Sequence, residues 1–355
     1  MSAIDKIKEQ DYYLIAEIGV NYYDIAKKLS ISNMEAAKLM MLEAKNAGID
    51  AVKFQTYKAG TLAAKESPSY WDTTEETTTS QYQLFKKFDS FGVEEYTELS
   101  NYAKEIEVDF LSTPFDFESA DYLYDLMEEY KISSSDLSNI PFIEHMSKKN
   151  RQIILSTGAS NIDEIQKAVD TIKSCNDKTI GLLHCVLEYP TPYEHANLKK
   201  ILTLKKEFPD CIIGYSDHTK PDECMDVIKL AYAYGAQIIE KHFTLDKTLS
   251  GNDHYHAMDP EDLRKIKNGL EFQKKIAGSS DLVCLETEKI ARLNARRSIV
   301  ANTDIKAGMI VTREMVTFKR PGMGISPSEI DLVIGKTAKS DIRDDTIIRF
   351  DMLEM

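Results

Sequence analysis

Short apolar runs alternate with longer amphipathic stretches through residues 1–280, and this alternation restricts the fold more than any other feature of the sequence. Most of the runs are rich in Ile, Val, Leu and Phe, which is typical of strands buried on both faces. Eight strand–helix units in this length predict an α/β fold, a closed (β/α)8 TIM barrel. The expected strands cover residues 13–20, 50–57, 109–115, 130–134, 152–158, 180–186, 211–216 and 237–245.

Two of the amphipathic stretches have clear helix boundaries. Ser32 and Glu35 have the spacing of a capping box, and this helix is expected to end before Gly48. Asp259 and the proline after it begin another helix, which is expected to run to about Ala277 and to stop at the next glycine. An open doubly wound sheet is the rival architecture, but no GxGxxG motif follows the first expected strand.

The character of the sequence changes near residue 280. Residues 281–291 are polar and are interpreted as a linker, and residues 292–355 carry short apolar segments separated by turn signals, which predicts a small second domain. Within the barrel, residues 58–107 contain a polar segment, 71–79, followed by two helical patterns. We interpret this region as a long active-site loop with helices, with an unrelated flexible insertion as the alternative.

The net charge of −14 argues against a nucleic-acid-binding protein, which would normally present a basic face. Residues 1–291 carry −16 and residues 292–355 carry +2, so an anionic substrate would need a locally basic pocket. No apolar run approaches the ~20 residues of a membrane span, and the N-terminal residues have no signal-peptide core. The five cysteines are scattered and form no CxxC motif, as expected for reduced thiols in a cytoplasmic protein.

Polar and ionisable residues stand at the carboxyl ends of the expected strands, which is where a barrel builds its active site. Packing alone would favour apolar residues there, so their convergence indicates a functional site. These strand-end residues are Glu17, Asn21, Lys53, Gln55, Ser112, Thr113, Lys131, Ser134, Asp136, Ser156, His184, Tyr189, Ser216, Asp217, His218, Lys241 and His242.

Two lysines and several hydroxyl groups at one mouth are suited to a phosphate or carboxylate ligand, because both group types donate to anionic oxygens. Lys53 lies within an apolar run, where a charge is costly without a partner; Lys131 is the other lysine. His218 and His242 have matching positions on neighbouring expected strands and are candidate ligands of a divalent metal. The alternative is a pair of hydrogen-bonded core histidines, and His184 is interpreted as a core residue.

Residues 253–256, Asp-His-Tyr-His, form a further polar cluster after the last expected strand. No tetrahedral set of zinc ligands is evident in it, and we interpret it as a sugar-binding loop. No GxSxG, HExxH, P-loop or CxxC motif occurs, so serine hydrolases, zincins and NTPases lose their usual sequence support.

Taken together and in order, the strand-end motifs resemble the sialic acid synthase family. They are residues 16–21 (AEIGVN), 52–56 (VKFQT), 111–116 (LSTPFD), 155–158 (LSTG), 189–192 (YPTP), 214–218 (GYSDH) and 240–246 (EKHFTLD). Residues 297–301 (RSIVA) and 319–322 (KRPG) resemble the C-terminal antifreeze-like (SAF) domain of that family. The resemblance covers nearly the whole chain.

The resemblance implies condensation of phosphoenolpyruvate with the open-chain aldehyde form of a 2-acetamido sugar, giving a nine-carbon 2-keto acid and phosphate. It also implies a divalent metal, usually Mn²⁺ with Mg²⁺ or Co²⁺ as substitutes, which His218 and His242 would hold so that it polarises the aldehyde oxygen. Such enzymes work as domain-swapped homodimers, in which Arg320 would reach the partner's active site and contact the N-acyl group.

The resemblance assigns a role to each further site residue. Glu17 matches a carboxylate near the aldehyde carbon, and Asp136 matches an acidic residue that helps water to add at C2. The positions that contact phosphoenolpyruvate correspond to Lys53, Lys131, Ser134, Ser156 and Ser216, with Thr113 as a further substrate contact. The sugar-side positions correspond to Gln55, Tyr189 and Asp253.

Three segments depart from the family pattern: residues 22–24 (YYD) replace His-Asn-Gly, Val186 and Leu187 replace small polar residues, and residues 133–136 (SSSD) replace Gly-Ser-Gly followed by an acid. N-acetylmannosamine is the default acceptor sugar, giving N-acetylneuraminate. The rival is a di-acetamido-trideoxyhexose, giving legionaminate or pseudaminate, and the apolar Val-Leu pair favours it. Two other classes stay open: an aldolase with a Schiff-base lysine, and a non-catalytic carbohydrate-binding or ice-binding protein.

Overall fold

The computed structural model describes residues 3–71, 73–74, 76–251 and 253–354, which form two compact units, Met1–Ala277 and Gly278–Met355. The first unit contains the barrel, and the second contains a small antiparallel sheet. Among the described residues, no helix has the length and apolar character needed to cross a bilayer.

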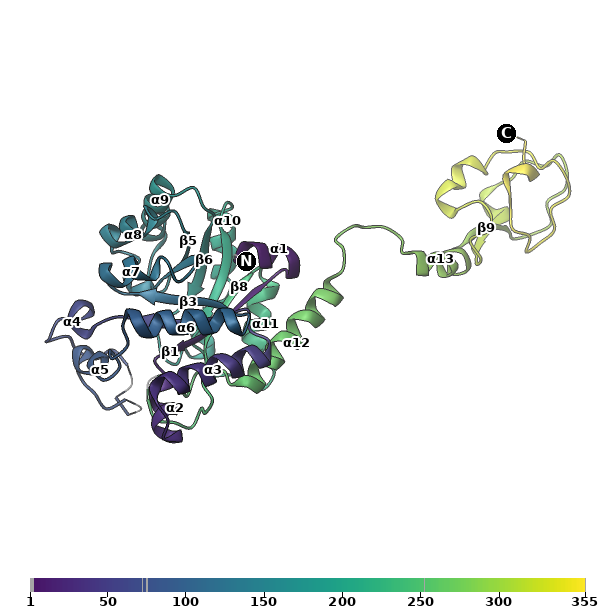
Figure 1. Ribbon diagram of the computed structural model, residues 1–355. Coiled ribbons are helices and arrows are strands. Elements are labelled where there is room, and N and C mark those ends of the chain that lie inside the picture. The colour runs from purple at the N-terminus through teal and green to yellow at the C-terminus, as the bar shows by residue number, and fades with distance from the viewer. Residues whose placement is uncertain (1–2, 72, 75, 252, 355) are drawn as a thin grey trace. The chain divides into compact units, whose positions relative to one another are not determined.

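Eight parallel strands form the first unit in the order β3-β2-β1-β8-β7-β6-β5-β4. The two strands at the ends of this order, β3 and β4, also lie side by side, so the sheet curls into a nearly closed barrel (Figure 1). All eight expected strands are confirmed, with ends that differ by at most three residues. They are β1 (Tyr13–Gly19), β2 (Ala51–Thr56), β3 (Asp109–Pro114), β4 (Glu129–Ile132), β5 (Gln152–Ser156), β6 (Ile180–Cys185), β7 (Ile212–Asp217) and β8 (Ile238–His242).

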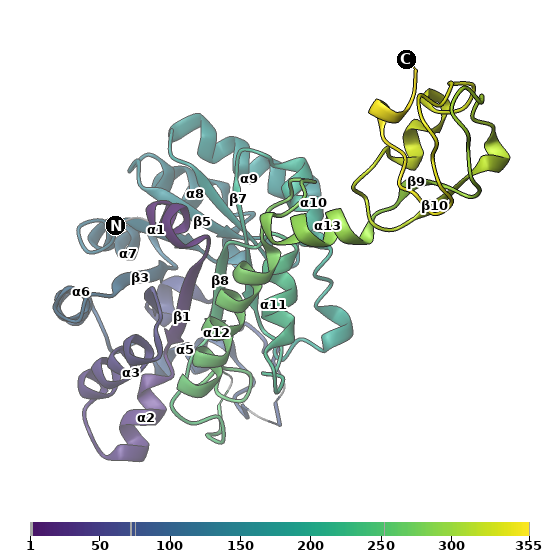
Figure 2. The same ribbon diagram turned by 90° about the vertical axis from the view of Figure 1, so that its right-hand side faces the viewer.

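Helices follow each strand and cover the outside of the barrel, and α12 packs between α3 and α11 (Figure 2). The helices of this unit are α1 (Ala3–Gln10), α2 (Tyr22–Leu29), α3 (Asn33–Ala47), α4 (Ala59–Leu62), α5 (Gln81–Lys87), α6 (Val93–Glu105), α7 (Phe117–Leu123), α8 (Ile140–Ser147), α9 (Ile162–Cys175), α10 (Lys200–Glu207), α11 (Asp226–Ala233) and α12 (Pro260–Ala277).

The two helices with clear sequence boundaries are confirmed at both ends. The Ser32 side chain accepts from the Glu35 amide, and the Glu35 carboxylate accepts from the Ser32 amide, which completes the capping box of α3. Gly48 ends this helix with φ of +98°, a left-handed conformation that glycine adopts without steric cost. The Asp259 carboxylate caps α12 by accepting from the Asp262 amide at 2.9 Å.

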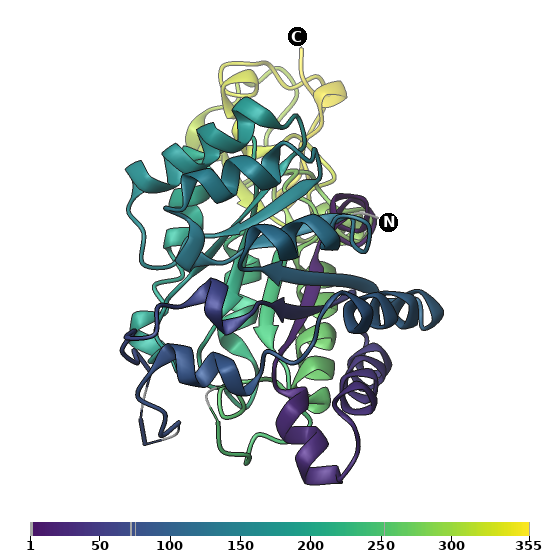
Figure 3. The ribbon, with the colours of Figure 1, turned by 60° about the vertical axis from the view of Figure 1, so that its left-hand side comes forward.

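Side chains inside the barrel change from apolar to charged along the strand direction. Because successive strand residues point to opposite faces, alternate residues share the interior. At the amino ends of the strands, Tyr13, Ile15 and Ile154 pack with Ala3 and Ile7 of α1, which closes this end. The opposite end of the barrel lies next to α4 and α5 (Figures 1 and 3), and the buried charged residues Glu17, Lys53, Lys131 and Glu240 lie further along their strands toward it.

The second unit contains β9 (Ser298–Ala301), β10 (Val316–Lys319) and α13 (Lys289–Ala295). Its small apolar core is built from residues such as Ile299, Val311 and Leu353. The sequence predicted a linker over residues 281–291 and a domain from residue 292. In the structure the division falls earlier, at Ala277/Gly278, and α13 begins inside the predicted linker. Residues 281–285 have no regular structure, residues 286–288 form a short 3-10 helix, and all of residues 281–291 are exposed.

The closed end of the barrel contains a buried carboxyl group, and this yields a first prediction. The Glu129 side chain accepts a hydrogen bond from the Ala3 amide, and burial raises the pKa of Glu129 to about 7. A pKa above the ordinary value means that the folded state loses stability as the pH rises from about 4.5 through 7. Glu129→Gln should therefore raise the melting temperature more at pH 8 than at pH 5, as followed by circular dichroism.

The neighbouring Glu128 provides a matched control, because its exposed side chain pairs with Arg151 at the surface. Glu128→Gln removes the same charge but should change the melting temperature little and equally at both pH values. Equal shifts for Glu129→Gln at pH 5 and pH 8 would contradict the argument.

Candidate active site

Four charged side chains are buried together inside the open end of the barrel. Glu17 of β1, Lys53 of β2, Lys131 of β4 and Glu240 of β8 are between 2% and 5% exposed. Each occupies an inward-facing position of its strand, two residues beyond an apolar one on β1, β2 and β8. Burying an isolated charge is very costly, so these groups require mutual pairing.

The four charges form a connected network. The Lys53 ammonium group contacts a carboxylate oxygen of Glu17 and lies 3.8 Å from Glu240 Oε2. Lys131 Nζ lies 3.6 Å from Glu240 Oε1. Glu240 therefore faces both lysines, and the two positive and two negative groups balance when both carboxylates are ionised.

Burial and pairing shift the pKa values of these groups in different directions. Burial raises the pKa of Glu17 to about 7, although the nearby Lys53 opposes this shift. For Glu240, burial favours the neutral form, but the attraction of Lys131 and Lys53 is stronger and lowers its pKa. Burial lowers the pKa of Lys131, whereas the two carboxylates raise that of Lys53 in spite of its burial. Of the two carboxyl groups in the network, Glu17 is thus the one that more readily takes up a proton.

Hydroxyl groups surround the two lysines. Lys53 Nζ donates to Thr113 Oγ1 at 3.1 Å, and Lys131 Nζ donates to Ser156 Oγ at 2.7 Å. Ser216 Oγ donates to Glu240 Oε1 at 3.0 Å. These groups line a small cavity of about 60 Å³, which we call the inner chamber; its lining is Glu17, Lys53, Gln55, Thr113, Phe115, Lys131, Ser133, Ser134, Ser156, Cys185, Leu187, Tyr189, Ser216, His218, Glu240 and His242.

Close approach of the backbone helps to shape the inner chamber. The Gly158 amide donates to Ser134 Oγ at 2.8 Å. A Cβ atom at Gly158 would lie 2.7 Å from the sulfur of Cys185 and 2.9 Å from Ser134 Oγ. A side chain at this position would therefore displace the groups that line the chamber.

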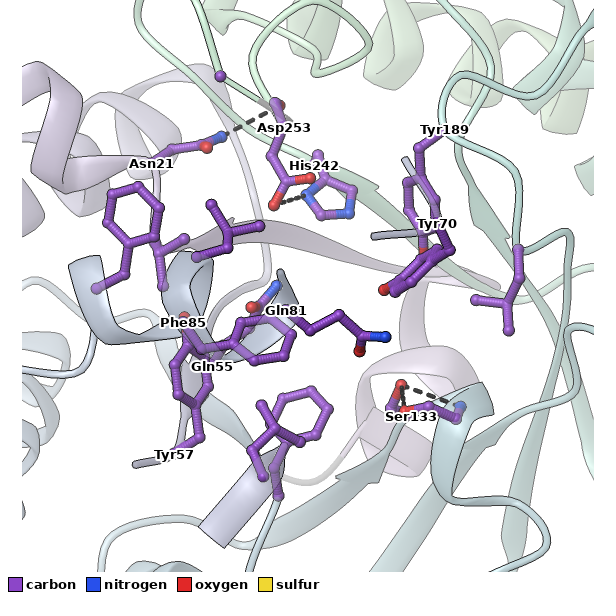
Figure 4. Close-up of a pocket in the computed structure, with 18 of the residues that line it drawn as sticks. Asn21, Gln55, Tyr57, Tyr70, Gln81, Phe85, Ser133, Tyr189, His242 and Asp253 are labelled. Carbon is purple, nitrogen blue, oxygen red and sulfur yellow. Dashed lines mark hydrogen bonds and ion pairs between the residues drawn. The ribbon is translucent and has the colours of Figure 1, made fainter. Parts of the chain in front are cut away.

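A larger cavity of about 560 Å³, the outer cavity, adjoins the inner chamber (Figure 4). Both are lined by Gln55, Phe115, Ser133, Leu187, Tyr189 and His242. Much of the remaining wall is apolar and comes from the segment between β2 and α6: Tyr57, Leu62, Tyr70, Leu84, Phe85 and Phe88. Residues 58–107 thus contain α4, α5 and α6 and contribute to the wall of the outer cavity, and their role as an active-site loop stays a prediction.

Three buried histidines meet at the border between the two cavities and the loop after β8. Ring centres are 5.5 Å apart for His218 and His242, 4.8 Å for His242 and His256, and 6.2 Å for His218 and His256. His218 Nδ1 donates to the Val186 carbonyl at 2.7 Å, which leaves the lone pair on Nε2. Burial lowers the pKa of His218 to about 4 and holds those of His242 and His256 well below the usual range.

These histidines are therefore neutral at pH 7, which is the form that binds metal ions. His242 Nδ1 has no hydrogen-bond partner in the described part of the chain and lies 3.7 Å from Asp253 Oδ2. Asn21 holds the loop in place by donating to the Phe243 and Asp253 carbonyl oxygens (Figure 4). The residues fit a divalent ion, because neutral imidazole and carboxylate are ligands for first-row metals.

Most of the expected site residues converge. The inner chamber is lined by Glu17, Lys53, Gln55, Thr113, Lys131, Ser134, Ser156, Tyr189, Ser216, His218 and His242. Asp136 and Asp253 line the outer cavity instead. Arg320 belongs to the second unit, where its side chain is exposed in the turn after β10.

Other strand-end residues lie away from the two cavities. The Lys241 ammonium group donates to Asp217 Oδ2 and to the Thr219 carbonyl, both at 2.6 Å. The side chains of Lys241 and Asp217 point away from the barrel interior, because each alternates along its strand with inward-facing residues. His184 Nε2 contacts the Ala196 carbonyl at 2.7 Å, so its interpretation as a core residue is confirmed.

Sequence reasoning did not include Glu240 among the site residues, and it placed His256 in a sugar-binding loop without predicting its contact with His242. Glu240 lies two residues before His242 on the same strand, so the two-residue period of a strand places it on the same inward face. This signal was available in the sequence. His256 follows an irregular loop, and no periodicity predicts that its ring turns toward His242.

Comparison with known proteins agrees with this geometry. Residues 40–281 match the NeuB family, and residues 296–354 match the SAF domain. The chain belongs to the NeuB family. The predicted membership of the sialic acid synthase family, the barrel fold and the C-terminal SAF domain are confirmed.

Relatives of this NeuB-family chain include N,N'-diacetyllegionaminic acid synthases and N-acetylneuraminate-9-phosphate synthases. It is 35% identical to the N,N'-diacetyllegionaminic acid synthase of Legionella pneumophila, over 96% of this chain and 94% of that protein. The synthase of the same name from Campylobacter jejuni is 36% identical, over 95% and 98% of the two chains. A crystal structure of the N-acetylneuraminic acid (sialic acid) synthetase of Leptospira borgpetersenii in complex with citrate is 33% identical, with a TM-score of 0.67 over 79% of this chain and 90% of that one.

The charge network predicts a large effect of a single substitution on stability. Glu240→Gln removes the carboxylate beside Lys131 and one of the two beside Lys53. Breaking a buried ion pair from one side typically costs about 3–5 kcal/mol, because the partner charge stays buried without compensation. We expect a loss of this size in the free energy of unfolding measured with urea at pH 7.

Glu188→Gln is the control for this substitution. Glu188 is paired with His195 at the surface, where such a pair contributes about 0–1 kcal/mol. If the Glu240 variant proved as stable as the Glu188 variant, the four charges would not form the network described above.

Proposed function

We propose that this protein condenses phosphoenolpyruvate with the open-chain aldehyde of an N-acetylated amino sugar and releases phosphate and a nine-carbon 2-keto acid. The observation that carries the proposal is the pair of buried lysines, Lys53 and Lys131, in a polar chamber that adjoins a larger cavity with both polar and apolar walls. A small anionic donor and a bulkier sugar acceptor need two such adjoining compartments.

Phosphoenolpyruvate is assigned to the inner chamber. Lys53 and Lys131 supply charge-assisted hydrogen bonds to its phosphate and carboxylate oxygens, and the hydroxyl groups of Ser134, Ser156 and Ser216 supply further donors. Because Glu17 and Glu240 already balance the two lysines, a bound anion requires further positive charge. A proton on Glu17, whose pKa is about 7, and a divalent cation at the histidines would provide it.

His218 and His242 are the residues proposed to hold this cation, which would act as a Lewis acid toward the aldehyde oxygen. The two side chains are suited to this role because both are buried and neutral, and His218 Nε2 keeps its lone pair free of the Val186 contact. Mn²⁺ is the expected ion.

The proposed chemistry forms one carbon–carbon bond at C3 of phosphoenolpyruvate. At C2, it replaces the bond to the phosphate oxygen by a bond to the oxygen of water. C3 of phosphoenolpyruvate bonds to the aldehyde carbon, and the aldehyde oxygen takes up a proton near Glu17. Water then adds at C2 and gives its proton to Asp136, a half-buried carboxylate whose pKa is raised by burial. The C2–oxygen bond to phosphate then breaks, the phosphate leaves with the electron pair of that bond and takes up the proton of the C2 hydroxyl, and the oxygen from water becomes the keto oxygen of the product.

The outer cavity is assigned to the sugar, with Gln55, Tyr189 and Asp253 as its polar contacts. The apolar part of its wall favours an acceptor with fewer hydroxyl groups, because Leu187 and the aromatic rings of Phe85, Phe88 and Phe115 cannot satisfy buried hydroxyls. We therefore propose a 2,4-diacetamido-trideoxyhexose as the acceptor, in agreement with the legionaminic acid synthases among the relatives. N-acetylmannosamine is the second candidate.

Phosphate release tests this proposal. We expect release from phosphoenolpyruvate with Mn²⁺ only when a sugar is added, fastest with a 2,4-diacetamido-trideoxyhexose, slower with N-acetylmannosamine and absent with unacetylated mannose. EDTA should stop the reaction, and added Mn²⁺ should restore it. Phosphate release without any sugar, or borohydride trapping of pyruvate on Lys131 with full activity in EDTA, would instead support a Schiff-base aldolase.

We also propose that the second unit completes the active site of another copy of the chain. Arg320 is exposed on the turn after β10, and its guanidinium group is suited to bind a sugar N-acyl oxygen. The basic character of residues 292–355, against an acidic barrel, favours such docking.

Mixing two inactive variants tests this arrangement. In a swapped dimer of His218→Ala with Arg320→Ala, one of the two sites carries both substitutions and the other carries neither. Activity should therefore return on subunit exchange, toward a quarter of the wild-type level when equal amounts exchange at random. If mixing restores nothing while each variant alone is inactive, Arg320 acts within its own chain.

A further inference from the structure

The loop after β8 brings an unexpected histidine into the cluster at the barrel mouth. His256 is fully buried, and neither of its ring nitrogens has a hydrogen-bond partner within the described part of the chain. A buried polar group without a partner costs roughly 1–3 kcal/mol, so such groups are rare in folded proteins. His242 Nδ1 is a third unpartnered nitrogen in the same place.

Ligand atoms of three residues converge at this point. One ring nitrogen of His242, one of His256 and a carboxylate oxygen of Asp253 all lie within 4.8 Å of one another. Two ligands at about 2.1 Å from one ion are at most about 4.2 Å apart. Three ligands that share one ion lie closer together than this limit, so the three side chains need shifts of less than about 1 Å each to bind one ion.

The spacing of the rings agrees with a shared ion. With a metal–nitrogen distance of about 2.1 Å, the centres of two imidazole rings on one ion are about 4.6–6.5 Å apart, from a right-angle to an opposite arrangement. The three distances among His218, His242 and His256 run from 4.8 to 6.2 Å and all fall in this range.

From these observations we infer that His256 is a protein ligand of the divalent cation and that His242, Asp253 and His256 form the core of its binding site. The inference rests on the proposed function for the role of the ion in the reaction, but not for the binding itself. It adds His256 to the ligands that the family resemblance implies. It also moves Asp253 from a sugar contact to the boundary between the metal and the sugar.

The donor set indicates which ions the site prefers. Two imidazoles with one carboxylate form a set typical of first-row transition metals, whereas Mg²⁺ and Ca²⁺ prefer oxygen ligands. His218 would add a third imidazole from β7. We therefore expect Co²⁺, Mn²⁺ and Zn²⁺ to bind more tightly than Mg²⁺, and water or substrate oxygens to fill the open positions.

Cobalt binding to the full-length protein tests the inference without any substrate. The protein is stripped with EDTA and titrated with Co²⁺, while calorimetry gives the affinity and visible absorption reports on the coordination. The wild-type protein should bind one Co²⁺. His256→Ala and His256→Gln should each weaken binding at least about tenfold and change the absorption spectrum, since even indirect partners of a metal ligand contribute that much.

Two controls separate this result from other causes. His195→Ala removes an exposed histidine and should leave Co²⁺ binding unchanged. Circular dichroism and melting temperature show whether each variant is folded, and the Gln variant keeps a polar side chain of similar size if the Ala variant is unstable.

The outcomes distinguish the inference from the proposed function. If wild-type protein binds Co²⁺ and both folded His256 variants bind it equally well, His256 is a packing residue and the inference is wrong, while metal-dependent synthesis stands. If wild-type protein binds no Co²⁺, the inference and the metal-dependent part of the proposed function both fail.

Discussion

The mouth of this barrel depends on the pairing of four charges that the strands place out of reach of water. Lys53 lies on β2, next to the strand that carries Glu17, and Lys131 lies on β4, across the barrel interior from Glu240. None of these charges could be buried alone at acceptable cost, so the network is a condition of the fold as well as a feature of the site. An anionic ligand that enters the chamber would pair with the two lysines in place of Glu17 and Glu240. The lysines are already held in position for this contact.

Along the barrel axis, the apolar residues that stabilise the fold lie at one end, and the residues of the candidate site lie toward the other. Apolar residues of the strands pack with α1 at the closed end, and the charged layer begins one inward position further on. Beyond it lie the histidines, and then the apolar wall that the segment after β2 contributes. In the proposed function, this order would place an anion, a cation and a sugar in sequence.

Much of this arrangement could be predicted from the sequence because strands bury regular patterns. The eight apolar runs and the capping signals of α3 and α12 predicted their elements closely, and the carboxyl ends of the runs held most of the site. The alternation along each strand also separates the inward Ser216 and His218 from the outward Asp217. Glu240 could have been found in the same way. His256 could not, because its position depends on an irregular loop and on packing against Tyr189 and His242.

The central claim is that Lys53 and Lys131 receive phosphoenolpyruvate in the inner chamber, and a crystal structure of that complex tests it most directly. We predict phosphate or carboxylate oxygens of phosphoenolpyruvate within about 3.2 Å of both Nζ atoms, a normal hydrogen-bond distance. Phosphoenolpyruvate bound only in the outer cavity, with both lysines still paired to Glu17 and Glu240 alone, would contradict the account.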